Sequence, residues 1–593
     1  MGVPGFFTWL IKNIKKLGAK NLILEKLEKK IKWLMLDTNC LLHPCVAYVL
    51  EQYNRGILEI DASIELRIQL ESYIWKIIVT YIDDMIEQVK PEYIYIAIDG
   101  VAPMGKIIQQ RQRRYRFLFD KKNKFNNNKK SEKELDNLSY KTIIKSNGIE
   151  ESIIPISSIE LTPGTDYMER IHKQMEDYMK NLEKKGIKYV YSSYHDEGEG
   201  EHKILQYIKK NINLTDSIVI YGLDADLLFL SLGTNTNHDL YIMREKQIFD
   251  NKEVDLDKIP KYNYVEIKLL HTLTENLEIS TNDFIVLCFL IGNDFLPKLL
   301  TMDIKKGGLD KIFNMWKNLK NKLGLTTKFN ETNKIESYLV NYDKKNNKYC
   351  INFEILKSIF QELLWTEKYL WKNKLPTYQN LIISEDTKNI ISLKEEEDKK
   401  KQFNEGIISN TNFLEKIEFN SSIEYYSYYL GINCIDIDKS IIKKMVNDYI
   451  GGINWCMEYY LNECPNWTWG YNFMIAPLIK DIINFFPHKQ IDNIFHNSGN
   501  IRTLNPVEQL ILAIPPQTYK YVIEKELINK IKSNINIGYM FPESFGIDIN
   551  KEYMFYKCMV KIPIVEYKEY EKCIKELNIK NEKNEIYGII KNF

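Results

Sequence analysis

The chain has 593 residues, of which 44% are hydrophobic, and this length predicts two or more domains with buried cores. Its 81 Lys and Arg residues balance 80 Asp and Glu residues, giving a formal net charge of +1, so any nucleic-acid site has to be a local patch of charge. Nine cysteines without a C-x-x-C pair argue against a zinc knuckle, and the absence of a long apolar run argues against a membrane span.

Short apolar runs alternate with helical patterns over the first 310 residues. Runs of this kind, rich in β-branched and aromatic residues, are typical of strands. Because helical stretches separate them, they imply βαβ units, and therefore an α/β fold with a largely parallel central sheet flanked by helices. The predicted strands are IKWLMLD (31–37), YIYIAID (93–99), IKYVYSS (187–193), SIVIYGLD (217–224) and DLYIMRE (239–245).

The composition changes twice after the predicted sheet. Residues 311–420 are rich in Lys and Asn and contain the charge run KEEEDKKK, which predicts a helical, partly disordered linker. An aromatic-dense region begins at YYSYYLG, residues 425–431. We therefore predict a first domain at 1–310, a linker at 311–420 and a second, mostly helical unit at 421–593. A polar segment at about 120–150 is predicted as a helix extension or a mobile loop.

Acidic residues follow three of the predicted strands, and two further acidic sites flank predicted helices. Ligands of open α/β sheets bind beyond the carboxyl ends of the strands. Two like charges about 4 Å apart repel by roughly 4 kcal/mol at an effective dielectric constant near 20, so a cluster at this edge predicts bound cations. Oxygen ligands select Mg²⁺ or Mn²⁺, and a cluster this large can hold two ions around a phosphodiester. The acids are Asp37, Asp99, Glu199, Glu201, Asp224, Asp226 and Asp294.

A cationic helix face follows the second of these acids. Lys106, Gln110, Arg113 and Arg114 recur at i, i+4, i+7 and i+8 after the strand that ends at Asp99, so they share one face of a predicted helix. A carboxylate beside such a face fits an anionic substrate that also needs a metal ion.

Each feature has a simpler explanation when it is taken alone. A single Asp after a strand is more often a turn former or a helix cap, and Glu199 and Glu201 could be favourable charges in the first turn of a helix. The cationic face could be an ordinary solvated surface. His43 is more often structural, and Trp467 and Trp469 more often lie in a core. The coincidence of five acidic sites with one cationic face favours the functional interpretation.

Longer sequence blocks point to a family. They occur in the order MGVPGFFTWL, LDTNCLLHPC, IAIDGVAPMGKIIQQRQRRYR, LTPGTDYM, GEGEHKI, YGLDADLLFL, CFLIGNDFLPKL, GINWCMEYYLNECPNWTWGYNF and NPVEQLILAIPP. In these blocks the chain resembles the eukaryotic 5′-to-3′ exoribonucleases of the XRN type, in a short form without a long C-terminal extension. The resemblance covers most of residues 1–310 and about 425–520. It implies a PIN/FEN-like nuclease core and processive hydrolysis of single-stranded RNA with a 5′-monophosphate, using Mg²⁺ or Mn²⁺ as two ions.

The resemblance also implies roles for individual residues. The seven acids are implied as catalytic metal ligands. Lys106, Gln110, Arg113 and Arg114 are implied to bind the 5′-phosphate. His43 is implied to stack on the first base together with a tryptophan, and both Trp467 and Trp469 are open as that partner. Such stacking tolerates any sequence, because every base has a π-face.

Departures from the family pattern leave alternatives open. Asp196 and Glu197 make the stretch before GEGEHKI unusually acidic, so they either alter the metal site or face solvent. One alternative function is a flap-type 5′ DNA nuclease, which shares an acid-rich sheet. Another is a non-catalytic RNA-binding descendant, although all seven acids are present. A cytoplasmic monomer without membrane contact is expected, with the nucleus as the other compartment.

Overall fold

The computed structural model describes most of the chain in thirteen stretches. The described residues are 5–14, 23–127, 141–144, 150–153, 156–234, 239–245, 262–304, 307–328, 335–372, 422–488, 503–548, 559–577 and 590–591.

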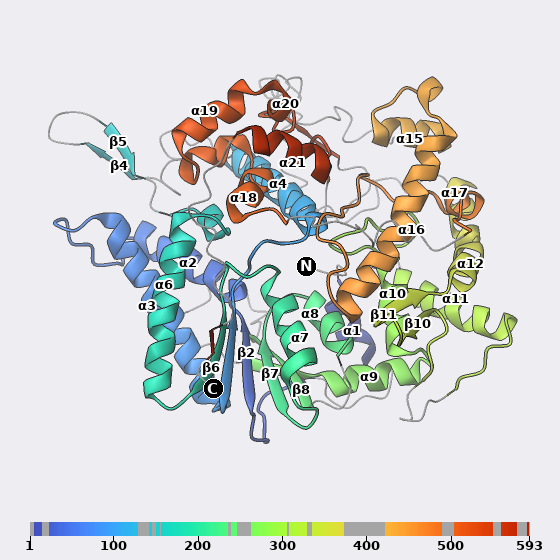
Figure 1. The fold of residues 1–593 in the computed structure, drawn as a ribbon, viewed down its shortest axis with the longest axis horizontal. Coiled ribbons are helices and arrows are strands. Elements are labelled where there is room, and N and C mark those ends of the chain that lie inside the picture. Colours follow the sequence, from blue (N-terminus) through green and yellow to red (C-terminus); the bar gives the residue numbers. More distant parts are fainter. Residues whose placement is uncertain are drawn as a thin grey trace.

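A mixed sheet lies at the centre of the first half of the chain (Figure 1). Within the described residues it has eight strands in the order β1-β9-β8-β7-β2-β3-β6-β14. The middle five run parallel, whereas the outer strands β1, β9 and β14 pair antiparallel. The strands are β1 (Ile23–Leu24), β2 (Trp33–Asp37), β3 (Tyr93–Ala97), β6 (Lys188–Ser192), β7 (Ser217–Tyr221), β8 (Asp239–Glu245), β9 (Tyr262–Glu266) and β14 (Ile590–Lys591).

All five strands predicted from the sequence are confirmed, as is the α/β class. β2 lies in the middle of the sheet, with β3 and β7 as its neighbours. From β2 the chain first builds the sheet toward β3 and β6, and then returns to the other side of β2 with β7 and β8. The strand order therefore reverses beside β2, and this is where ligands of open α/β sheets bind.

The two faces of the sheet bury alternate residues of each strand, as the pleat requires. Leu34 and Leu36 of β2 pack with α2 (Asn39–Asn54), α3 (Leu66–Val89) and α6 (Asp166–Lys184). Trp33 and Met35 pack into a second core on the opposite face. The helices that contribute to this second core are α1 (Phe6–Ile14), α7 (Gly200–Asn211), α8 (Asp226–Leu232), α9 (Ile267–Asn276) and α10 (Thr281–Phe289).

The second core continues into the helical half of the chain, by which we mean the elements between residues 308 and 484. Its longest helix is α16 (Lys439–Leu461), which is buried continuously from Tyr449 to Leu461 and lies beside α8 and α10 (Figure 1). The sheet and this half therefore share one hydrophobic core. The remaining elements here are α11 (Gly308–Lys322), β10 (Val340–Asp343), β11 (Lys348–Ile351), α12 (Phe353–Lys372), α15 (Ser422–Leu430), η5 (Cys434–Asp436) and α17 (Ile479–Asn484).

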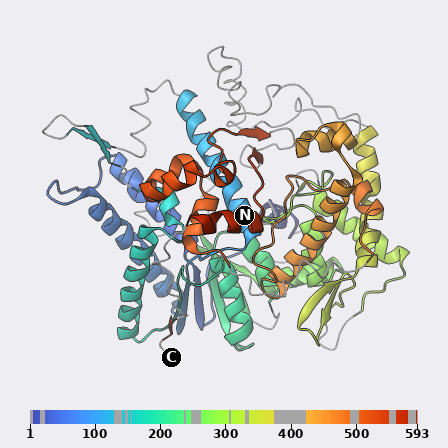
Figure 2. The ribbon, with the colours of Figure 1, turned by 45° about the horizontal axis from the view of Figure 1, so that its top comes forward.

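A third core surrounds the first turns of α4 (Met104–Asn127). Figure 2 shows this helix against the C-terminal helices. Arg111 of α4 is buried there and donates hydrogen bonds to the carbonyl oxygens of Leu512 and Met540, so this cation has a structural role. The elements around α4 are α18 (Pro506–Ala513), η7 (Pro516–Tyr521), α19 (Lys525–Ser533), α20 (Ile535–Gly538), β12 (Gly546–Asp548), β13 (Met559–Lys561) and α21 (Tyr567–Glu576).

The predicted domain boundary at residue 310 stays a prediction. The boundary at 420 and the charge run KEEEDKKK lie outside the described residues, and so do residues 128–140 of the polar segment. A short hairpin of β4 (Lys141–Ile144) and β5 (Glu150–Ile153) follows that segment. Eight cysteines lie in the described residues, and all are free thiols. None of the helices described is long and apolar enough to cross a membrane.

Candidate active site

The seven predicted acids meet at the carboxyl ends of the parallel strands. Asp37 ends β2 and Asp99 follows β3. Glu199 and Glu201 lie at the N-terminus of α7, whereas Asp226 begins α8 after β7. Asp224 and Asp294 precede α8 and follow α10, respectively. These acids perturb one another's pKa values, directly or through a shared neighbour.

Gly200 allows two of the acids to approach the N-terminus of α7. Its backbone N–H donates a 2.6 Å hydrogen bond to Oδ1 of Asp99. A Cβ atom at this position would lie 2.7 Å from Oδ1 of Asp37 and 3.3 Å from the carbonyl oxygen of Ala97. A side chain at this position would therefore displace the carboxylates, so packing requires the second glycine of GEGEHKI, Gly200.

Crowding makes several of the acids hard to ionise together. Burial, reinforced by Asp99, raises the pKa of Asp37 to about 8. Burial and Glu199 raise the pKa of Asp99 to about 6. Burial and Asp294 raise the pKa of Asp226 to about 7. Without a metal ion among them, these carboxyls share protons at neutral pH.

Lys106 supplies one positive charge inside the cluster. Its Nζ atom lies 2.7 Å from Oε1 of Glu199 and 2.7 Å from Oδ2 of Asp294. Although burial acts to raise the pKa of Asp294, the Lys106 ammonium holds it below its usual range. The ammonium of Lys106 therefore points into the acid cluster, and its predicted contact with a 5′-phosphate stays a prediction. Within the described residues, no three His, Cys, Asp or Glu side chains converge at metal-binding spacing.

Two arginines of α4 form no ion pair with a carboxylate in the part of the chain that the structure describes. Arg113 is exposed, and Arg114 is partly buried beside it. Burial and the Arg113 charge lower the pKa of Arg114 to about 9. The hydrogen bond that Nη2 of Arg114 donates goes to a neutral acceptor, Oγ1 of Thr162, at 2.7 Å. Nη1 of Arg114 and Oε1 of Gln110 are buried without a hydrogen-bond partner, so this face is suited to an anion.

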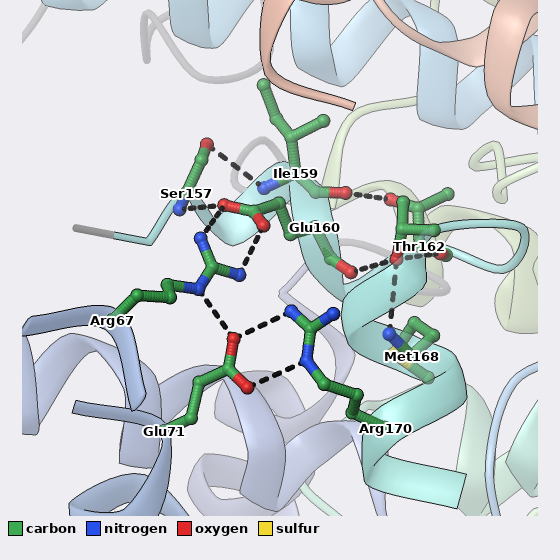
Figure 3. Close-up of polar contacts among 9 residues, drawn as sticks. Arg67, Glu71, Ser157, Ile159, Glu160, Thr162, Met168 and Arg170 are labelled. Carbon is green, nitrogen blue, oxygen red and sulfur yellow. Dashed lines mark hydrogen bonds and ion pairs between the residues drawn. The ribbon is translucent and has the colours of Figure 1, made fainter. Parts of the chain in front are cut away.

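Thr162 is itself held by the charge network drawn in Figure 3. Arg67 of α3 pairs with Glu160 of η2 (Ser158–Leu161) at 2.6 Å. Glu71 accepts from Arg67 at 2.5 Å and from Arg170 of α6 at 2.7 Å. Paired in this way, the four side chains fix η2 between α3 and α6. The Thr162 hydroxyl then has a defined position from which it orients Arg114.

His43 lies near the same arginines. The residue is exposed, yet desolvation by the surrounding protein, followed by the charges of Arg113 and Arg114, lowers its pKa to about 4. The imidazole is therefore neutral at neutral pH. A neutral ring next to these two arginines can stack on a base without adding charge.

The structure distinguishes the two candidate tryptophans. Trp469 stacks on Trp455 with ring centroids 4.9 Å apart, and a Cβ on Gly452 would lie 2.9 Å from its ring. Trp469 is thus part of the core packing. Trp467 lies beside Gly198, one residue before Glu199, with ring atom Cη2 3.7 Å from a Cβ placed there. Trp467 is therefore the better candidate for contact with a bound base.

Asp196 and Glu197 bond away from the acid cluster. Oδ2 of Asp196 accepts a 2.9 Å hydrogen bond from the Ser192 hydroxyl. Glu197 is exposed and accepts a hydrogen bond from the Thr503 hydroxyl. The charges of Asp196 and Glu197 act to raise the pKa of Lys203. The Lys203 ammonium donates hydrogen bonds to the carbonyl oxygens of Ile98 and Ser193 and not to either acid.

Three buried residues of this site were not predicted from the sequence. Tyr459 and Tyr460 of α16 donate hydrogen bonds to Glu199 and Asp226, and Lys203 ties the ends of two strands together. The only available signal was position, since Lys203 directly follows GEGEH and the tyrosines precede the WTW segment by a few residues.

Family sequence models match both halves of the chain. The model described as XRN 5′-3′ exonuclease N-terminus matches residues 1–246. The model described as Xrn1 helical domain matches residues 274–427 and 423–587. The first match contains the five parallel strands and six of the seven acids, whereas the second contains Asp294, α16 and the C-terminal helices.

Several curated proteins are similar over nearly the whole chain. The 5′-3′ exoribonuclease 1 of Homo sapiens is 25% identical, covering 99% of this chain and 34% of the human protein. The 5′-3′ exoribonuclease 1 of Schizosaccharomyces pombe is 25% identical, with 95% and 48% covered. The 5′-3′ exoribonuclease 2 of Arabidopsis thaliana is 24% identical, with 96% and 66% covered. The chain thus spans between about a third and two thirds of the length of these relatives.

Proposed function

The chain belongs to the XRN 5′-3′ exonuclease family, and from this premise we propose that it is a 5′-to-3′ exoribonuclease. Its substrate in this proposal is single-stranded RNA with a 5′-monophosphate. The names of the similar proteins support an exoribonuclease. We also propose that it releases one nucleotide at a time.

One observation supports a substrate with a terminal phosphate. The Arg113 and Arg114 pair forms no ion pair with a carboxylate of the described residues, although acids crowd the neighbouring strand ends. The Arg113 charge contributes to lowering the pKa of Asp294, which supports the proposal that the arginine pair and the acid cluster serve one substrate. A terminal phosphate on the arginines would place the first phosphodiester toward the acids.

The chemistry of the acid cluster suits a divalent cation, although its side chains are not at metal-binding spacing in the described residues. Oε2 of Glu201 is buried without a partner, and the cluster consists of the hard oxygen donors that Mg²⁺ and Mn²⁺ select. We propose that the seven acids together hold two of these ions. When bound, such ions would polarise the phosphodiester and lower the pKa of an attacking water.

The protein's own side chains set which bond is cut. Arg113 and Arg114 can each donate two N–H groups to phosphate oxygens, and the Gln110 side chain lies on the same helix face. Fixing the terminal phosphate beside the acids makes the first linkage the one that is hydrolysed. His43 and Trp467 would hold the first base by stacking, and this favours repeated cleavage without release of the RNA.

The substrate class is tested with two labelled oligonucleotides of equal sequence and length, one RNA and one DNA, both 5′-phosphorylated. With Mg²⁺, the RNA is expected to be degraded to mononucleotides from its 5′ end, and EDTA is expected to stop the reaction. Equal or faster cleavage of the DNA would instead favour a flap-type DNA nuclease. Binding of RNA without any cleavage would favour a non-catalytic RNA-binding protein.

Removing the stacking side chains is expected to reduce processivity. His43→Ala or Trp467→Ala should shift products from mononucleotides toward partly degraded RNA, because one stacked base contributes about 1 to 3 kcal/mol. The measurement is the product ladder under single-hit conditions. Trp365→Ala is the matched control, since Trp365 is an exposed tryptophan on α12. Ladders identical to wild type in both variants would remove the stacking role.

The stabilisation by Mg²⁺ is expected to grow with pH. The pKa values of about 8 for Asp37 and about 7 for Asp226 lie above those of unfolded Asp, so the metal-free folded protein holds more protons than the unfolded chain. Its stability therefore falls as pH rises from 6 to 8. Mg²⁺ binds the ionised carboxylates, so it should raise the melting temperature more at pH 8 than at pH 6. An equal or larger increase at pH 6 would contradict the proposed ligands.

A further inference from the structure

Two consecutive tyrosines connect the helical half of the chain to the acid cluster. The Tyr459 hydroxyl donates a 3.0 Å hydrogen bond to Oε2 of Glu199. The Tyr460 hydroxyl donates a 2.8 Å hydrogen bond to Oδ1 of Asp226. Both tyrosines lie near the C-terminal end of α16, whereas the two acids belong to the N-terminal ends of α7 and α8. Consecutive residues of one helix thus reach two different helices of the sheet half.

The Tyr459 ring is fixed by aromatic packing. It lies parallel to the His202 ring, with centroids 4.2 Å apart and planes inclined by 3°. It is also stacked on Trp455, with centroids 5.0 Å apart, and Phe295 packs against it edge-on at 5.0 Å. The ring therefore has little freedom to turn, and its hydroxyl has one position.

The Tyr460 ring is fixed in a similar way. Phe289 packs against it with centroids 5.1 Å apart, and Phe295 lies edge-on to it at 6.4 Å. The residue is 1% exposed, so water cannot replace the Asp226 carboxylate as its hydrogen-bond acceptor. Moving the hydroxyl would leave two buried polar groups unpaired, which is costly.

Each hydrogen bond uses one carboxylate oxygen and orients the other. Oε2 of Glu199 is bound to Tyr459, so Oε1 turns toward the Lys106 ammonium at 2.7 Å. Oδ1 of Asp226 is bound to Tyr460, which fixes the rotation of that carboxylate as well. Partners of this kind, which hold a metal ligand without touching the metal, typically change metal affinity or activity by about 10 to 100-fold when they are removed.

We infer that Tyr459 and Tyr460 are positioning residues for the metal-binding carboxylates Glu199 and Asp226, so that the helical half supplies part of the metal site. This inference rests on the proposed function, since it takes the acid cluster as the metal site. It adds a reason for the shared core of the two halves, because the sheet half alone would lack both hydroxyls.

The chain offers a matched control on the same helix. Tyr449 is also fully buried in α16, and its hydroxyl donates to the carbonyl oxygen of Pro297 at 3.2 Å. Tyr449→Phe therefore removes a buried tyrosine hydroxyl and its hydrogen bond without touching an acid. Tyr459→Phe and Tyr460→Phe make the same chemical change, but each also removes the hydrogen-bond donor of a carboxylate, Glu199 or Asp226 respectively.

The test is a Mn²⁺ titration of the metal-free full chain without RNA, followed by electron paramagnetic resonance. Tyr459→Phe and Tyr460→Phe are expected to weaken Mn²⁺ binding by about tenfold or more, whereas Tyr449→Phe should match wild type. The melting temperatures of the three metal-free variants should fall alike. Mn²⁺ affinities within twofold of wild type in both Tyr459→Phe and Tyr460→Phe would overturn the inference.

A double variant separates positioning from a general loss of packing. If Tyr460 acts through Asp226, then adding Tyr460→Phe to Asp226→Asn should change the Mn²⁺ affinity by less than twofold, because the carboxylate is already absent. A further tenfold loss in the double variant would show that Tyr460 acts on the fold instead. The titration uses no RNA, so an inactive wild type would overturn the proposed function while this comparison still decides the inference.

Discussion

Replacing Asp226 with Asn is expected to abolish RNA hydrolysis while leaving RNA binding in place. The Asn side chain keeps an oxygen for the Tyr460 hydroxyl but removes one charged metal ligand. Because metal ions stabilise the transition state by several kcal/mol, and each 1.36 kcal/mol is tenfold in rate, kcat should fall by about 1000-fold or more. Asp224→Asn is expected to behave in the same way, since Asp224 lies two residues earlier at the same strand end.

The measurement combines single-turnover rates with RNA binding and thermal melting. The melting temperature of the metal-free Asp226→Asn protein should not fall, because burial and Asp294 already raise the pKa of Asp226 to about 7 and the substitution relieves that repulsion. Asp196→Asn is the matched control from the neighbouring loop, where Asp196 bonds Ser192. Rates near wild type in both Asp224→Asn and Asp226→Asn would refute the metal assignment.

Replacing Arg114 with Ala is expected to remove most of the preference for a 5′-phosphate. Arg114 has a buried Nη1 atom without a partner, so the substitution takes away a donor that is available to the substrate. Hydrogen bonds to charged groups contribute about 1.5 to 3 kcal/mol, so the ratio of kcat/KM for 5′-phosphorylated over 5′-hydroxyl RNA should fall by about tenfold or more. Arg113→Ala is expected to have the same direction of effect.

A general surface charge would behave differently in this comparison. It would weaken binding of both RNA ends alike and change the salt dependence, so the ratio would stay constant. Arg55→Ala serves as this control, because Arg55 is an exposed arginine that pairs with Glu51 on α2. An unchanged ratio in Arg113→Ala and Arg114→Ala would show that these residues do not read the RNA end.

The central sheet could be predicted from sequence because its signal is local. Each parallel strand is a short run of β-branched and aromatic residues that ends in or near an acid, and the carboxyl ends of parallel strands meet at one edge. That rule alone brings Asp37, Asp99 and Asp224 together. Three outer strands were not predicted: β1 and β14 have only two residues each, too few to show a periodic pattern, whereas β9 has five residues.

The partners of the site residues could not be predicted, because they come from distant parts of the chain. Helical spacing groups Lys106 with Gln110 and Arg113, yet its ammonium turns to Asp294, which lies 188 residues away. Tyr460 meets Asp226 across 234 residues. In both cases a buried charge or hydroxyl must find a partner, and the sequence pattern contains no information on which partner is near.

The most direct test of the account compares one RNA with two different ends. Wild-type protein with Mg²⁺ is given 3′-labelled RNA carrying either a 5′-phosphate or a 5′-hydroxyl, and kcat/KM and product lengths are measured for each. Mononucleotide release from the 5′ end is expected, with a ratio of at least about 10 in favour of the phosphate, equivalent to one charge-assisted hydrogen bond. Equal rates for the two ends, or cleavage within the RNA, would contradict it.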